Sequence, residues 1–177
     1  EDILLDLADS QTPQGIVAVV QKEEVGQADF SQGKFLFLED VQDPGNVGTI
    51  IRTADAAGFT GVIVSDKSAD IYSLKTLRSM QGSHFHLPIY RMSSQALLKE
   101  TKEAGIPVLA TTLSKDSVDY RELVPIENFV LVMGNEGQGI SPLMAESADQ
   151  LVHIRMKGQA ESLNVAVAAG ILIFHLS

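Results

Sequence analysis

Short runs of β-branched and aromatic residues alternate with helix-like segments along most of this chain, and this alternation constrains the fold more than any other feature. It predicts βαβ units, and hence an α/β fold with a mostly parallel sheet and helices on both faces. We expect strands over residues 35–38, 61–64, 108–111, 129–133 and 151–154. We expect helices over residues 47–57, 71–80, 94–104, 142–148 and 162–175. Residues 85–90 look extended, and Pro88 restricts them to an edge strand or a loop.

Composition narrows the class of protein. The 177 residues are 45% hydrophobic and 20% charged, which suits a globular domain with a sizeable core. The net charge of −10 argues against a protein that coats a polyanion, but it does not exclude a nucleic acid as substrate. The absence of cysteine excludes disulfides, thiolate catalysis and Cys-ligated zinc, and the histidines lack the spacing of metal ligands. For these reasons we expect no metal site. The longest apolar stretch, 165–176, is too short to span a bilayer, so we expect no membrane partner.

The opening of the chain differs from the rest. It is acidic, with Lys22 as the only base in the first 30 residues, and a turn signal at 12–15 precedes a strand-like stretch at 16–20. We expect residues 1–28 to be the tail of a truncated N-terminal domain plus a linker, and residues 29–177 to form the main domain. The alternative is that the opening residues add a strand and a helix to that same domain.

Three segments carry residues suited to chemistry. The first runs from Glu39 to Arg52 and leads from a strand into a helix. Asn46 can cap that helix, and the free N–H groups of a helix start suit a phosphate or carboxylate. Arg52 follows six residues later, nearly two turns, so both side chains can face the same side. The alternative is a capped helix with a solvated arginine.

The second segment runs from Met133 to Pro142 and follows an apolar strand; its glycine-rich part is Gly134-Asn135-Glu136-Gly137-Gln138-Gly139-Ile140. Its glycines permit tight turns and a close approach of the backbone to a ligand. It is neither a P-loop nor a dinucleotide fingerprint, because it has no Lys-Ser/Thr pair and lacks the last glycine of that fingerprint. Glu136 would repel phosphate, so a ligand with hydroxyls or a positive charge fits better. The alternative is a plain strand-to-helix connection.

The third segment runs from Ile154 to Asn164 and leads into the last helix; it ends with Glu161-Ser162-Leu163-Asn164, directly before Val165. Ser162 is a good N-cap, and together with Asn164 it places a hydroxyl and an amide at the start of that helix. Residues 165–176 are apolar nearly all round, which is typical of a helix buried on most faces. Either a subunit interface or the protein core could bury it.

In this order, the three segments resemble the motifs of the SpoU (TrmH-type) RNA methyltransferases of the SPOUT superfamily, over about residues 34–175. The stretch at 12–20 is similar to the end of the small substrate-binding domain that often precedes the catalytic domain in this family. Two departures are Arg155, where the family usually has proline, and Ala166, where serine is common.

The resemblance implies a parallel α/β sheet with a C-terminal trefoil knot, and a catalytic domain over residues 29–177. It implies S-adenosylmethionine as cofactor, a ribose 2′-hydroxyl of rRNA or tRNA as methyl acceptor, and a cytoplasmic homodimer that associates through the knot region. Two groups of residues are carried over from the family. The catalytic group is Arg52, Asn46, Glu136, Ser162 and Asn164. The cofactor-binding group is Thr111, Thr112, Gly134, Ile154 and Leu163.

Two other classes of function stay open on the sequence. One is a catalytically silent module that binds RNA or a nucleotide on the same fold; the presence of all five carried-over catalytic residues argues against it. The other is a small-molecule α/β enzyme with an anionic ligand, which binding of S-adenosylhomocysteine would distinguish from a methyltransferase.

Overall fold

A seven-stranded sheet forms the centre of the molecule, with its strands in the order β3-β2-β1-β6-β4-β7-β5. Every neighbouring pair of strands is parallel. The computed structural model describes residues 16–22, 25–124 and 126–177. The strands are β1 (Lys34–Leu38), β2 (Gly61–Val64), β3 (Ile89–Arg91), β4 (Val108–Thr111), β5 (Val118–Asp119), β6 (Phe129–Met133) and β7 (Gln150–His153). The expected mostly parallel α/β fold is thus confirmed.

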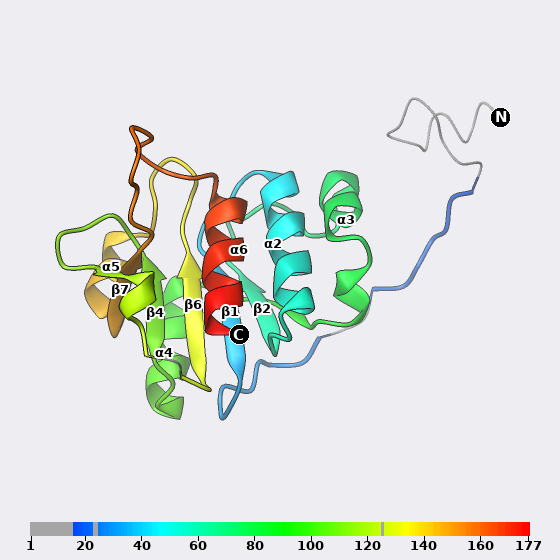
Figure 1. Ribbon diagram of the computed structural model, residues 1–177. Helices are drawn as coiled ribbons and strands as arrows, with labels where there is room; N and C mark the ends of the chain where they lie inside the picture. Colours follow the sequence, from blue (N-terminus) through cyan, green and yellow to red (C-terminus); the bar gives the residue numbers. More distant parts are fainter. Residues whose placement is uncertain (1–15, 23–24, 125) are drawn as a thin grey trace.

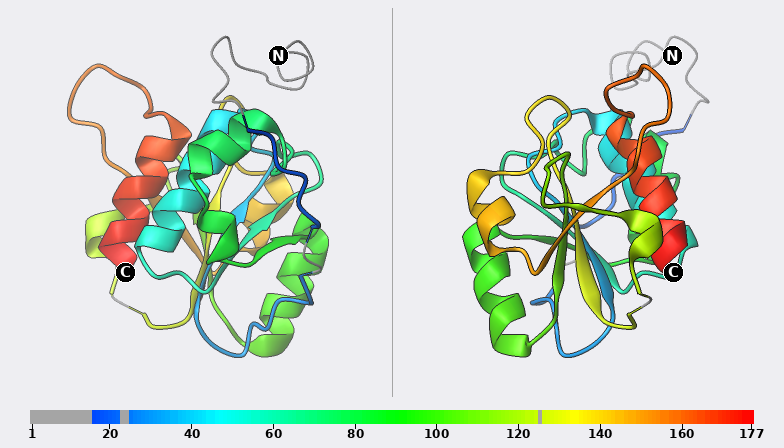
Figure 2. Two further views of the ribbon diagram at one scale, coloured as in Figure 1. Left: turned by 90° about the vertical axis from the view of Figure 1, so that its right-hand side faces the viewer. Right: turned by 60° about the vertical axis from the view of Figure 1, so that its left-hand side comes forward.

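Helices cover both faces of this sheet (Figures 1 and 2). On one face lie α2 (Pro44–Ala56), α3 (Leu74–Met80) and α6 (Val165–Leu176), and on the other lie α4 (Ser94–Ala104) and α5 (Pro142–Ser147). The side chains of β1 alternate accordingly: Leu36 and Leu38 belong to the core under α2 and α6, and Phe35 and Phe37 to the core under α4 and α5. Among the described residues, no helix is long and apolar enough to cross a membrane.

Three helices begin at other residues than the sequence predicts: α3 begins at Leu74 instead of residue 71, and α2 and α6 also have other N-caps. Asp43 caps α2, because its Oδ1 accepts a hydrogen bond from the backbone N–H of Asn46 at 2.9 Å. Asn164 caps α6 by accepting from the N–H groups of Ala166 and Val167. The predicted caps Asn46 and Ser162 were therefore wrong: the first lies inside α2, and the second lies in the loop before α6.

Short elements account for most of the other differences. The stretch 85–90 divides into a 3₁₀ helix, η1 (Ser83–Phe85), and the edge strand β3, which agrees with the edge position that Pro88 indicated. The two-residue β5 and the 3₁₀ helix η2 (Tyr120–Glu122) were not predicted. The expected strand at 16–20 is absent, since these residues are exposed and form no ladder with the described part of the chain. The turn at 12–15 lies outside the described residues.

The helices α2 and α3 approach closely at Gly48. A Cβ atom there would lie 2.5 Å from the Thr76 carbonyl oxygen and 2.6 Å from Ser79 Cβ. We expect Gly48→Ala to destabilise the protein by about 1–3 kcal/mol, because the helices must move apart. Gly170→Ala in α6 is the matched control: its Cβ would meet only Thr53 Cγ2 at 4.0 Å, and alanine favours a helix by up to about 1 kcal/mol. Urea unfolding of both variants checks this; equal stabilities would contradict it.

Candidate active site

A cavity of about 460 Å³ opens beside the carboxyl ends of β4, β6 and β7. This size is within the range of small-molecule sites, and the position is the one that parallel sheets favour for ligands. The walls combine apolar side chains with hydroxyl, amide and carboxylate groups. The lining residues of the cavity include Thr111, Thr112, Met133, Gly134, Glu136, His153, Ile154, Met156, Ser162, Leu163 and Leu172.

All five residues expected to bind a cofactor lie on this cavity. They come from three separate parts of the chain, namely the end of β4, the start of the loop after β6, and the segment from β7 to α6. Thr111 is held in place because its hydroxyl donates to the Val132 carbonyl at 2.9 Å. The backbone N–H of Thr112 donates to the Val152 carbonyl at 3.0 Å. The cavity wall is therefore anchored to the sheet.

The glycine-rich segment 134–140, here called the glycine loop, folds back on itself. Asn135 and Gly139 exchange two backbone hydrogen bonds of 2.9 Å each. Gly134 lies close to the end of the loop, where a Cβ on Gly134 would stand 2.3 Å from the Gly139 carbonyl carbon and 2.4 Å from the Ile140 nitrogen. Only glycine fits there, so the shape of this cavity wall depends on that residue.

A chain of hydrogen bonds joins the three sequence motifs beside the cavity. The Asn46 amide nitrogen donates to Glu136 Oε1 at 3.1 Å, and the Asn46 amide oxygen accepts from Asn164 Nδ2 at 3.0 Å. These contacts fix the orientation of the Asn46 amide. Since Asn164 also caps α6, the start of α6 is tied to α2 and to the glycine loop.

The Glu136 carboxylate is fully engaged by donors. Besides Asn46, it accepts from the backbone N–H groups of Gln42 at 3.1 Å and Asp43 at 3.0 Å. Partial burial raises the pKa of Glu136, but the hydrogen bonds from Asn46, Asp43 and Gln42 outweigh it and hold the pKa below its ordinary value. Glu136 is thus an ionised clamp on the β1–α2 loop rather than a free base.

An ion pair supports the start of α2. Lys75 Nζ lies 2.9 Å from Asp43 Oδ2, and both side chains are partly exposed. The hydrogen bond from Lys75, followed by the one from the Asn46 N–H, holds the pKa of Asp43 below its usual range. The cap of α2 therefore stays charged at neutral pH.

The five residues expected to be catalytic do not all meet. Asn46, Glu136 and Asn164 form the hydrogen-bonded chain, and Ser162 lines the cavity as an exposed side chain. Arg52 is exposed on α2 and is not among the residues lining the cavity. Within the described ranges its side chain makes no hydrogen bond or ion pair, so its guanidinium is available to a ligand outside the cavity.

Four polar residues that line the cavity were not among the predicted site residues, namely Asn135, Gln138, His153 and Glu161. Asn135 donates to the Asp40 carbonyl at 2.8 Å and accepts from the N–H groups of Gly137 and Gln138, which shapes the glycine loop. An asparagine directly after a strand and before glycines is a known turn signal that could have found it. His153 lies 2.9 Å from the Ser117 hydroxyl, and no sequence signal links these two residues.

Comparison with known proteins identifies the family. The sequence model of the SpoU rRNA Methylase family matches residues 33–174. A curated relative, the 23S rRNA (guanosine(2553)-2′-O)-methyltransferase RlmP of Bacillus subtilis, is 45% identical over 176 residues, which are 99% of this chain and 70% of the relative.

Solved structures agree with this match. An AdoMet-bound rRNA methyltransferase from Sinorhizobium meliloti superposes with a TM-score of 0.77 at 43% identity, covering 81% of this chain and 55% of that one. The SpoU methyltransferase AviRb from Streptomyces viridochromogenes, in complex with AdoMet, gives a TM-score of 0.74 at 34% identity, covering 84% of this chain and 60% of that one. This chain thus spans little more than half the length of these two structures. Because the family match covers most of its residues, the chain belongs to the SpoU rRNA methylase family.

Proposed function

We propose that this chain transfers a methyl group from S-adenosylmethionine to a ribose 2′-hydroxyl of ribosomal RNA. The observation that carries the proposal is the hydrogen-bonded chain Glu136–Asn46–Asn164, which joins three distant motifs at the mouth of the cavity. The curated Bacillus subtilis relative carries out this chemistry on 23S rRNA, and two of the solved structures hold AdoMet.

The cavity suits the proposed cofactor. Apolar side chains such as Ile154, Leu163 and Leu172 can flank an adenine ring, while Thr111 and Thr112 offer hydroxyls for polar groups. The ionised Glu136 favours a cationic ligand over a phosphate. When bound, S-adenosylmethionine supplies an activated methyl group on a sulfonium centre. The protein's main task is therefore to align the ribose hydroxyl with that methyl group.

The residues at the site act by positioning. Glu136 accepts three hydrogen bonds, and these lower its pKa and make it a weaker proton acceptor. The Arg52 guanidinium offers a planar fork of N–H donors and no acceptor, so it serves to hold the ribose oxygen and a neighbouring phosphate. Ser162 lies on the cavity and can contact either substrate. The proton of the ribose 2′-hydroxyl passes to water or to a phosphate of the RNA.

Further properties of the family belong to the proposal. Val167 and Phe174 of α6 are 53% and 58% exposed, and an outward apolar face supports a homodimer through the C-terminal region. After β7 the chain returns across the sheet to α6, which packs on α2, and this path is compatible with a trefoil knot. We place the protein in the cytoplasm, where it would meet rRNA; a tRNA substrate is the alternative.

Two measurements test the proposal. In calorimetric titration, S-adenosylhomocysteine should bind with a dissociation constant on the order of micromolar. In cells lacking the gene, mass-spectrometric mapping should show one 2′-O-methyl nucleotide missing from rRNA and restored by the gene. Binding without any missing methyl group would favour the silent RNA-binding module. The absence of cofactor binding would favour a small-molecule enzyme.

A further inference from the structure

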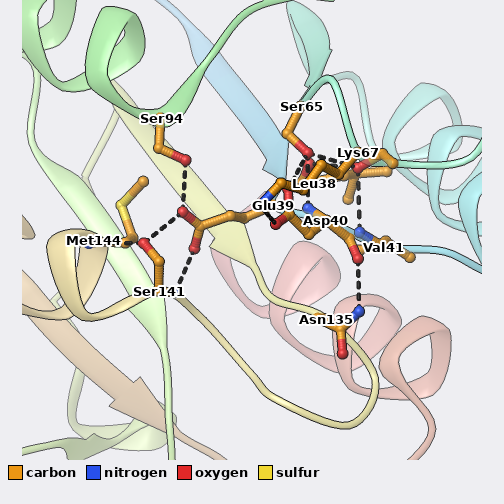
Figure 3. A network of polar contacts seen from close by, with 11 residues as sticks. Leu38, Glu39, Asp40, Val41, Ser65, Lys67, Ser94, Asn135, Ser141 and Met144 are labelled. Atoms are coloured by element: carbon orange, nitrogen blue, oxygen red, sulfur yellow. Dashed lines mark hydrogen bonds and ion pairs between the residues drawn. The ribbon is translucent and has the colours of Figure 1, made fainter.

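Glu39 is a buried carboxylate that the proposed mechanism does not use. It follows β1, is only 3% exposed, and is not among the residues lining the cavity. A buried carboxylate is costly unless hydrogen bonds compensate for the lost water. Its two oxygens accept from the Ser94 hydroxyl at 2.5 Å, the Ser141 hydroxyl at 2.8 Å and the Ser141 backbone N–H at 2.8 Å (Figure 3).

Glu39 holds both ends of the glycine loop. Its backbone N–H donates to the Met133 carbonyl at 2.9 Å, where the chain enters the loop, and its side chain binds Ser141, where the chain leaves it. Between these points, the Asn135 amide donates to the Asp40 carbonyl at 2.8 Å (Figure 3). Glu39 and its neighbour Asp40 thus hold the glycine loop at its entry, near its start and at its exit.

The Ser141 hydroxyl connects this carboxylate to α5. It donates its proton to Glu39 Oε1 and accepts a hydrogen bond from the Met144 N–H at 3.1 Å, which caps α5 (Figure 3). Because the hydroxyl hydrogen is directed at the carboxylate in this hydrogen bond, a lone pair of the hydroxyl oxygen stays directed at the helix. Glu39 thus fixes where the loop ends and α5 begins.

We infer that Glu39 is a positioning residue for the methyl-donor site, acting through Ser141 on the glycine loop. The inference rests on the proposed function, in which this loop forms a wall of the cofactor cavity. The hydrogen bonds of the carboxylate form two arms, one to Ser141 and one to Ser94, and substitutions can remove each arm separately. The Ser141 arm leads to the glycine loop, whereas the Ser94 arm leads to α4, which contributes no residue to the cavity lining.

The test measures the affinity for S-adenosylhomocysteine by calorimetry and the melting temperature for each variant. We expect Glu39→Leu, which keeps the volume and removes every acceptor, to weaken binding by at least about tenfold, as removal of supporting groups does at other ligand sites. Glu39→Gln should bind within about threefold of the unsubstituted chain. Its amide oxygen can accept from the Ser141 N–H while its amide nitrogen donates to the two hydroxyls, so the geometry is kept.

Single-arm variants keep the test decisive if Glu39→Leu does not fold. Ser141→Ala should weaken binding by at least about tenfold. Ser94→Ala removes a hydrogen bond to the same carboxylate, and Ser93→Ala removes the N-cap of α4; both should lower the melting temperature and leave affinity unchanged. The inference is overturned if Ser141→Ala binds normally, or if affinity falls with melting temperature alike in all three serine variants. If the unsubstituted chain binds no S-adenosylhomocysteine, the proposed function itself fails.

Discussion

Gly134→Ala weakens cofactor binding roughly 100-fold or more, while Gly137→Ala, three residues along the same loop, leaves it nearly unchanged: this is the result we expect from the geometry of the glycine loop. A Cβ added at Gly134 would stand 2.3–2.6 Å from three backbone atoms of Gly139 and Ile140. Backbone cannot rotate away as a flexible side chain can, so the loop must open. An overpacking cost of about 3 kcal/mol corresponds to a loss of affinity of roughly 100-fold or more.

The control isolates this clash from the general effect of adding a methyl group. Gly137 also lines the cavity, but a Cβ there would meet only Asn135 Oδ1 at 3.7 Å, which is ordinary contact, and the residue does not need a left-handed backbone. Calorimetric titration with S-adenosylhomocysteine, together with the melting temperature of each variant, measures the difference. Micromolar binding by a folded Gly134→Ala protein would show that the glycine loop does not form the cofactor wall.

The sequence predicted the sheet better than its edges. The apolar runs at 61–64, 108–111 and 129–133 coincide with β2, β4 and β6, because a strand buried on both faces has a continuous apolar signal. The strand β5 has two residues at the edge of the sheet, where little burial is required, and so it leaves no such signal. The order of the strands could not be derived from periodicity, since it depends on pairings between distant residues.

At the site, too, the sequence predicted local features better than contacts between distant residues. The resemblance of the motifs to those of the family implied that Gly134, Glu136 and Asn164 belong to the site; Gly134 and Glu136 line the cavity, and Asn164 belongs to the hydrogen-bonded chain beside it. The roles as caps were wrong, because Asp43 and Asn164 reach more backbone donors than Asn46 and Ser162 do. Which partner a polar side chain contacts depends on the packed fold, and this is also why the sequence assigned no role to Glu39, although Glu39 is the first residue of the first segment.

Arg52→Lys is the second substitution with a large expected effect, and it should act on the rate alone. We expect the rate of methyl transfer to fall about 100-fold, while the affinity for S-adenosylhomocysteine stays unchanged. Lysine keeps the charge but loses the planar fork of donors that can hold a ribose oxygen and a phosphate together. Arg52 lies outside the cavity lining and its side chain has no hydrogen-bond or ion-pair partner within the described ranges, so its removal should disturb neither the cofactor wall nor the fold.

Arg121→Lys provides the matched control for this substitution. Arg121 binds the Asp119 carboxylate through two nitrogens and holds the pKa of Asp119 well below its usual range, but neither residue lines the cavity. Its replacement should therefore lower stability and leave methyl transfer unchanged. Single-turnover transfer to rRNA, and the extent of ribose methylation in deletion cells carrying each variant gene, give the two readouts. A near-normal rate in the Arg52→Lys variant would show that charge alone suffices at this position. A parallel loss of affinity for S-adenosylhomocysteine would show that Arg52 supports binding of the methyl donor rather than of the RNA.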